Sequence, residues 1–79
     1  MRANRAYELI VRRGGRAPAL LADPARTDHV EVVELASGEA VLFWDTGPAQ
    51  TGRLARRLRA DLAQLEADDF IARWRASGA

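Results

Sequence analysis

Residues 29–45 read HVEVVELASGEAVLFWD and predict a β-hairpin. The runs His29–Ala36 and Glu39–Asp45 are rich in the β-branched and aromatic residues that favour strands. Between them, Ser37-Gly38 is the kind of two-residue connection that closes a tight hairpin turn. We therefore expect the two runs to pair as neighbouring antiparallel strands.

A two-residue turn also fixes which residues of the two strands face each other. The expected pairs are Val33 with Leu42, Val32 with Phe43, and Glu31 with Trp44. Side chains alternate along a strand, so the apolar residues fall on two faces. One face would carry Val33, Leu35, Leu42 and Trp44, and the other Val30, Val32, Val41 and Phe43. Because both faces are partly apolar, we expect a covering layer on each.

Before the hairpin, Tyr7–Arg12 predicts a further strand, with Tyr7, Leu9 and Val11 on one face. Residues 16–22 can form an edge strand, the one place where Pro18 would be tolerated, because proline cannot donate a ladder hydrogen bond. The predicted meander therefore has three strands, or four if residues 16–22 pair.

After the hairpin, four leucines recur at the spacing of one helix face: Leu54, Leu58, Leu62 and Leu65. Asp45 or Thr46 can cap the start of this helix. Pro48 suits its first turn, where the missing N–H has no helical acceptor. Burying the four leucines would contribute roughly 6–12 kcal/mol, so we expect them at the centre of the core.

The helical pattern changes after Leu65. On the same helical wheel, Asp69 would fall among the leucines, whereas Phe70, Ile71 and Trp74 would fall on the opposite side. Burying an unpaired carboxylate is costly, so we expect a break near Asp68-Asp69 and a short second helix after it. The predicted fold is α+β: an antiparallel β-meander packed against one amphipathic C-terminal helix, with this short second helix after the break.

A chain of 79 residues has room for one domain, residues 1–79, in which we expect residues 1–5 to be flexible and residues 76–79 to form a tail. It has no cysteine and one histidine, which excludes disulfides and Cys/His zinc sites, and we expect no cofactor. No apolar run approaches the roughly 20 residues that span a bilayer, so we expect a cytoplasmic protein without a membrane partner. All 12 basic residues are arginine, which we interpret as the codon usage of a GC-rich bacterial genome.

The tripeptide Asp45-Thr46-Gly47 follows an apolar strand and resembles the catalytic tripeptide of aspartic proteases. The resemblance implies an acid/base role for Asp45 and would make the chain a small enzyme. The same tripeptide also suits a strand-to-helix junction, where Asp45 would cap the helix. His29, with Asp28 and Glu31 beside it, is a second candidate for acid–base or metal chemistry, although alternation places Asp28 on the other face of the strand.

Arginines cluster in the first half of the predicted helix. Arg53, Arg56 and Arg57 lie opposite the leucine stripe and would point to water, where they could bind phosphates of a nucleic acid. The alternative is an ordinary solvated helix face, because no aromatic residue that could stack on a base lies between these arginines.

The last candidates are Phe70, Ile71 and Trp74, which we interpret as a candidate protein interface. They would either cover the second face of the sheet within one chain or bury against another protein, since exposed apolar clusters mark interfaces. We therefore expect a non-enzymatic interaction or structural module that self-associates as a homodimer or binds another protein. Nucleic-acid binding and an enzyme based on Asp45 are the alternative functions.

Overall fold

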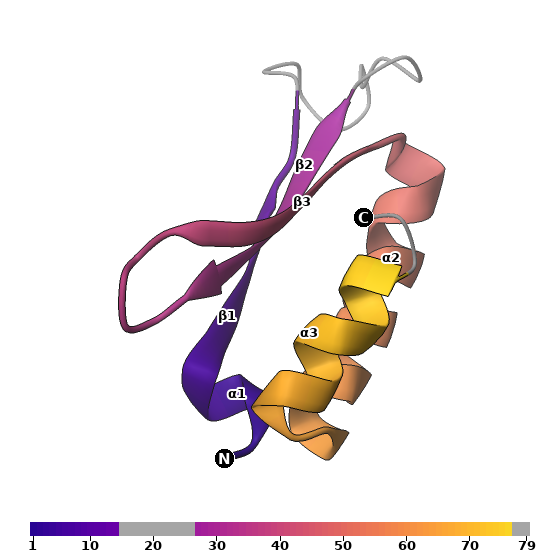
Figure 1. Ribbon diagram of the computed structural model, residues 1–79. Helices are drawn as coiled ribbons and strands as arrows, with labels where there is room; N and C mark the ends of the chain where they lie inside the picture. Colours follow the sequence, from indigo (N-terminus) through magenta and orange to yellow (C-terminus); the bar gives the residue numbers. More distant parts are fainter. Residues whose placement is uncertain (15–26, 77–79) are drawn as a thin grey trace.

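The computed structural model describes residues 1–14 and 27–76. It contains α1 (Ala3–Ala6), β1 (Tyr7–Arg12), β2 (Asp28–Glu34), β3 (Ala40–Thr46), α2 (Pro48–Gln64) and α3 (Ala67–Ala76). Figure 1 shows two layers, with the strands in one and the two long helices in the other. The predicted α+β fold is confirmed. The fourth strand predicted for residues 16–22 and the end of the predicted tail, residues 77–79, lie outside the described residues.

The three described strands form one antiparallel sheet in the order β1-β2-β3, which confirms the predicted meander. Leu9 of β1 lies opposite Val32, and Val32 lies opposite Leu42 of β3, so one row of side chains crosses all three strands. A second row joins Val11, Val30 and Trp44 on the same face. Tyr7, Leu9 and Val11 share this face, as predicted.

The register of the hairpin differs by one residue from the prediction. Val32 pairs with Leu42 instead of Phe43, and Glu31 pairs with Phe43 instead of Trp44. The connection is longer than Ser37-Gly38 and runs over residues 35–39. A β-bulge between Val32 and Val33 accompanies it.

Local hydrogen bonds explain the longer connection. The Glu34 N–H donates to the Glu39 carbonyl at 2.8 Å, and the Gly38 N–H donates back to the Glu34 carbonyl at 2.8 Å. Gly38 has φ of 74°, a conformation that glycine adopts without steric cost. A shift of one residue moves every side chain to the other face, so Val30, Val32, Leu42 and Trp44 now lie together. The predicted separation of Val30 and Val32 from Leu42 and Trp44 is therefore wrong.

The leucine stripe of α2 packs on this apolar face. Leu58 and Leu62 are buried, and Leu54 and Leu65 are partly buried against the same cluster. The cap differs from the prediction: neither Asp45 nor Thr46 caps the helix, and Gly47 is the N-cap residue. Pro48 occupies the first helical position, as predicted, and the Gly47 N–H donates to Gln50 Oε1 at 3.4 Å.

A break follows α2, as predicted, but it lies at Leu65-Glu66, a few residues before the two aspartates. Asp68 and Asp69 instead occupy the first turn of α3, where carboxylates interact favourably with the helix dipole. The N-terminal segment braces the break, because the Ala3 N–H donates to the Leu65 carbonyl and the Ala67 N–H donates to the Met1 carbonyl, both at 2.9 Å.

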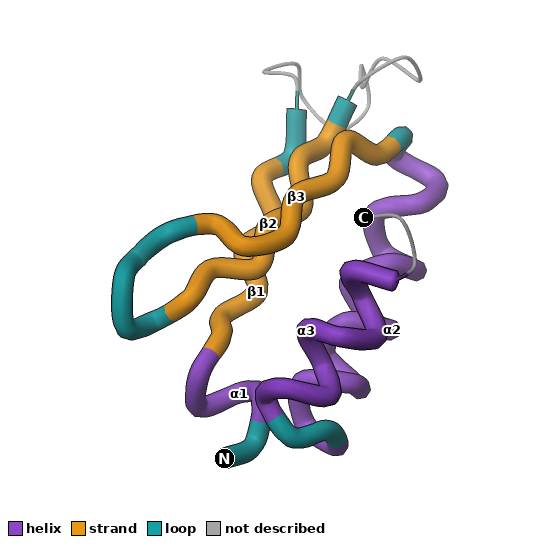
Figure 2. Tube along the Cα trace, in the orientation of Figure 1, coloured by secondary structure: helices purple, strands orange, loops and turns teal. Residues whose placement is uncertain are grey.

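The helix α3 lies beside α2 on the same face of the sheet, as Figures 1 and 2 show. Phe70 is fully buried and stacks on Tyr7 with ring centroids 5.9 Å apart. Trp74 meets Trp44 edge-on at 5.6 Å. The prediction that these residues could cover the second face of the sheet is therefore wrong: both helices cover one face, and no described helix covers the other.

Candidate functional site

The face of the sheet turned away from the helices is the first candidate surface, and we call it the open face. The register places three cross-strand rows on it: Arg12, His29 and Asp45; Ile10, Glu31 and Phe43; Glu8, Val33 and Ala40. Apolar side chains lie on either side of Glu31, which occupies the middle of the second row. Phe43 remains 49% exposed, and Ile10 and Val33 are half-buried.

Charged groups lie among and around these apolar side chains. Arg12 Nε lies 3.7 Å from Glu31 Oε1, which partly neutralises the one carboxylate of the middle row. Glu8 lies on the same strand as Arg12, near the opposite end of the face. The open face therefore carries opposite charges at the two ends of β1.

The open face also brings together two residues that the sequence singled out separately. His29 Nδ1 lies 2.6 Å from Asp45 Oδ1, and the imidazole stacks on the Phe43 ring at 5.6 Å between centroids. A carboxylate at Nδ1 fixes the orientation of an imidazole and favours the tautomer with its proton on that nitrogen. Nucleophilic catalysis needs a hydroxyl or thiol group beside such a base. No described hydroxyl group is hydrogen-bonded to His29 or Asp45, so the pair has no adjacent nucleophile among the described residues.

Metal ligands do not gather on the open face. Among residues 1–14 and 27–76, no group of three or more histidine, cysteine, aspartate or glutamate side chains could hold a metal ion. As predicted from strand alternation, Asp28 lies on the face opposite His29 and Glu31, where it is fully buried. The three residues therefore do not form one site.

Asp28 is part of a buried polar network that joins the sheet to α2. The Thr51 hydroxyl donates to Asp28 Oδ2 at 2.6 Å and lies 2.7 Å from the Thr46 hydroxyl. Because Thr51 has a single hydroxyl proton, the short contact to Asp28 leaves Thr46 as the donor to Thr51. The Gly14 N–H also donates to Asp28 Oδ1 at 2.8 Å. This network fixes the start of α2 against the ends of β2 and β3.

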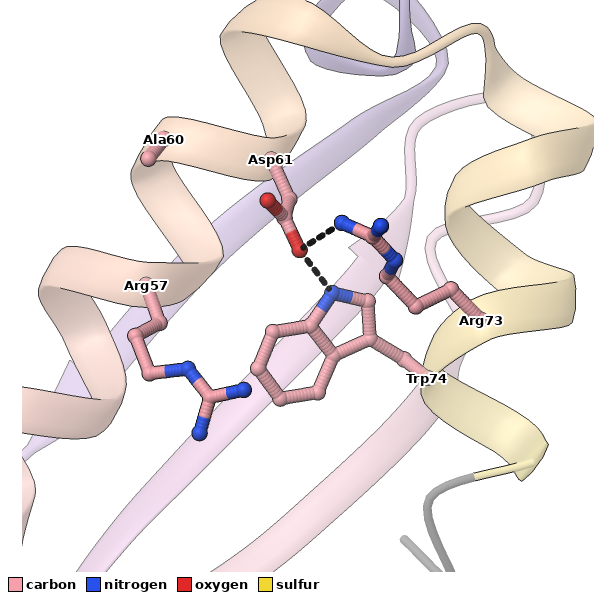
Figure 3. A pocket seen from close by; sticks show the side chains of 5 residues that line it. All are labelled: Arg57, Ala60, Asp61, Arg73 and Trp74. Carbon is pink, nitrogen blue, oxygen red and sulfur yellow. Dashed lines mark hydrogen bonds and ion pairs between the residues drawn. The ribbon is translucent and has the colours of Figure 1, made fainter.

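A second candidate surface lies between the two long helices (Figure 3). The Arg57 guanidinium carbon lies 5.4 Å from the centroid of the Trp74 ring, a cation–π contact. The Trp74 Nε1–H donates to Asp61 Oδ2 at 3.0 Å, and Arg73 Nη1 donates to the same oxygen at 3.4 Å. These side chains and Ala60 line a hollow of about 490 Å³.

The structure separates the three arginines that were predicted to bind nucleic acid. Arg53 and Arg57 line a second hollow, of about 240 Å³, with Thr46, Gln50 and Leu54. Arg56 is exposed and lines neither hollow. The contact between Arg57 and Trp74 was not predicted, because the two residues lie on different helices and no spacing in the sequence indicates that they meet.

The residues predicted as a protein interface lie mostly inside the chain. Phe70 and Trp74 belong to the core, with exposed fractions of 0% and 4%, and Ile71 is partly buried against the same cluster. Phe43 of the open face, with half of its surface exposed, was not predicted as a contact residue. The predicted register, which is wrong by one residue, placed Phe43 on the same face as Val30 and Val32 and so did not indicate that Phe43 is exposed.

Comparison with known proteins gives no relative from which a function could be transferred. No family model, curated protein or solved structure matches this chain. Within the described part of the chain, no helix has the length and apolar character that crossing a membrane requires.

Proposed function

We propose that the chain is a self-associating interaction module, and that its contact surface is the open face of the sheet. The observation that carries the proposal is Phe43, which is 49% exposed in the middle row of a sheet face that no described element covers. Ile10 lies two strands away in the same row, and Val33 lies in the next row. Removing apolar side chains of this kind from water against a second surface lowers the free energy of the system.

Size favours a second copy of the chain as the partner. A domain of 79 residues buries only about 60% of the surface that its unfolded chain exposes, so a further layer would stabilise it substantially. Two sheets pack face to face about 10 Å apart, with side chains of their inner faces interdigitated. Two copies joined through their open faces would form four layers, with the sheets inside and the helices outside.

The charges of the open face suit a twofold dimer. If the axis lies in the sheet plane and perpendicular to the strands, Arg12 meets Glu8 of the second copy, and Phe43 meets its own counterpart. If the axis runs parallel to the strands, Arg12 meets Asp45 of the second copy, and Phe43 meets Ile10. Both orientations follow from the rows of the register. In each of them Arg12 meets a carboxylate and Phe43 meets an apolar side chain, while Glu31 meets its own counterpart and keeps its Arg12 partner.

The test is the absolute mass in solution as a function of concentration, measured by sedimentation equilibrium. We expect a dimer, and we expect Phe43→Asp to weaken dimerisation by about thirtyfold, the ~2 kcal/mol typical of a buried aromatic contact. Ala63→Asp is the matched control, because it adds the same charge on an exposed position of α2. A mass that stays monomeric for the unaltered chain at millimolar concentration would contradict the proposal.

Charge reversal distinguishes the two orientations. Arg12→Glu should weaken the dimer in either of them. Adding Glu8→Arg should restore dimerisation only for the axis perpendicular to the strands, and adding Asp45→Arg only for the parallel axis. Restoration by neither second change would show that the copies do not meet through this face.

A further inference from the structure

Arg57 stands between the two hollows along α2. The hollow of about 240 Å³ extends from Arg57 toward Arg53, Leu54 and the end of β3, and the hollow of about 490 Å³ extends toward Asp61 and Trp74. Both lie on the helix side of the molecule, away from the open face. A ligand in them would therefore not compete with the proposed dimer contact.

The guanidinium of Arg57 is held in place by an aromatic ring, and no carboxylate of residues 1–14 or 27–76 forms an ion pair with it. It lies over the Trp74 ring, and Trp74 is itself fixed by its hydrogen bond to Asp61 (Figure 3). Asp61 Oδ2 is already bonded to the Trp74 and Arg73 donors. A guanidinium stacks on an aromatic ring through its flat face, and its N–H groups point outward in its own plane. Arg57 can therefore still donate hydrogen bonds to a ligand.

Arg53 lies one helical turn before Arg57 and lines the same hollow. Like charges four residues apart destabilise a helix by a few tenths of a kcal/mol. In the described part of the chain, neither of these arginines forms an ion pair, whereas Arg12, Arg13 and Arg73 each pair with a carboxylate. Among the described residues that line this hollow, Arg53 and Arg57 are both positively charged, none is acidic, and Leu54 forms an apolar wall beside them.

We propose that Arg53 and Arg57 form a binding site for a phosphoryl group, either a free phosphate dianion or the phosphomonoester of a small molecule. Two guanidinium forks match the charge and the oxygen geometry of a phosphate dianion better than those of a single carboxylate. In a phosphomonoester, the organic group bonded to the phosphoryl group would make an apolar contact with Leu54. Arg56 is outside this site.

The experiment is a titration of the full chain, followed by NMR of the arginine Nε–H and tryptophan Nε1–H signals, with inorganic phosphate and with phenyl phosphate. We expect saturable shifts of Arg53, Arg57 and Trp74. Arg53→Gln and Arg57→Gln should each weaken binding by at least about tenfold, the effect of removing one charged hydrogen-bond donor. Arg56→Gln, the matched control, should change affinity by less than about twofold.

The two probes separate the sources of the phosphoryl group. Tighter binding of phenyl phosphate, with shifts of the Leu54 methyl signals, would assign the site to a phosphomonoester, and equal binding would assign it to the free ion. Equal losses in the Arg53, Arg56 and Arg57 variants would overturn the proposal in favour of a diffuse arginine face, as nucleic-acid binding requires. Shifts that do not saturate would also overturn it. A monomeric chain would leave it intact, because the site lies within one copy.

Discussion

The two faces of the sheet are built from the same three strands, yet they differ in almost every physical property. On the covered face, Val30 and Val32 are fully buried, and Leu42 is 4% exposed. On the open face, Phe43 is 49% exposed although it is larger than any of them. The apolar content of a strand therefore does not decide which of its faces the rest of the chain covers.

Charge at the centre of each face accounts for the difference. The middle row of the open face contains Glu31, whereas the corresponding row of the covered face, Leu9, Val32 and Leu42, is entirely apolar. Any cover on the open face must leave Glu31 and its Arg12 partner hydrated or hydrogen-bonded, whereas the middle row of the covered face makes no such demand. The covered face has its buried carboxylate, Asp28, only at its end, where hydroxyl and amide groups satisfy it.

The largest expected effect comes from comparing two truncations, one of an aromatic residue packed on the covered face and one of an aromatic residue on the open face. Phe70→Ala should lower the free energy of unfolding by about 3–5 kcal/mol, because it leaves a cavity beneath Tyr7 and beside Trp74. Phe43→Ala should lower it by less than about 1 kcal/mol at concentrations where the chain is monomeric, since half of that ring is already in water. Urea denaturation measures both, and equal losses would show that the faces are not different.

A smaller effect tests the polar end of the covered face. Thr51→Val keeps the shape of the side chain but removes the hydroxyl that donates to Asp28 and accepts from Thr46. We expect a loss of about 1–3 kcal/mol, because Asp28 loses the hydrogen bond from Thr51 and the buried Thr46 hydroxyl loses the acceptor for its proton. Thr51→Ser retains the hydroxyl, so it should recover most of this loss in thermal denaturation. A valine variant as stable as the unaltered chain would contradict the assigned network.

The smallest effect concerns the turn that keeps α3 on the covered face. The hydrogen bond from the N-terminal amine to Glu66 at 2.8 Å, and the charge of that amine, lower the pKa of the Glu66 carboxyl. The stability that the ionised Glu66 carboxylate contributes is therefore fully present above the ordinary pKa of a glutamate, about 4.3. It is lost as the pH falls through the lowered pKa that this carboxyl has in the folded state.

An NMR titration of the Glu66 carboxyl should show this lowered midpoint. Acetylation of the N-terminal amine should raise the midpoint, because it removes both the donor and the charge. A midpoint that acetylation does not move would show that the amine is not the cause. The effect on stability should be small, since the ion pair is exposed to water.

Some features of the site could be predicted from residue spacing. The separation of His29 and Glu31 from Asp28 follows from strand alternation alone, and the structure confirms it. The pairing of His29 with Asp45 could not be predicted with the wrong register, because it requires the two residues to share a cross-strand row. The stacking of Arg57 on Trp74 depends on how α2 and α3 lie against each other, which no local pattern determines.

By itself, the sequence determined the three described strands, the two longer helices, their order and the break after the leucine stripe, because these depend on local periodicity, turn chemistry and the cost of burying a charge. It did not indicate the short helix α1. Tertiary structure alone decided the hairpin register and the face on which α3 lies. The register depends on which side chains the helices bury together. The connection between α2 and α3 has two residues, Leu65 and Glu66, and an extended chain covers at most about 3.6 Å per residue. The start of α3 therefore stays close to the end of α2, and α3 packs beside α2 on the same face of the sheet. With both helices on the covered face, Phe43 and its neighbours remain on the open face.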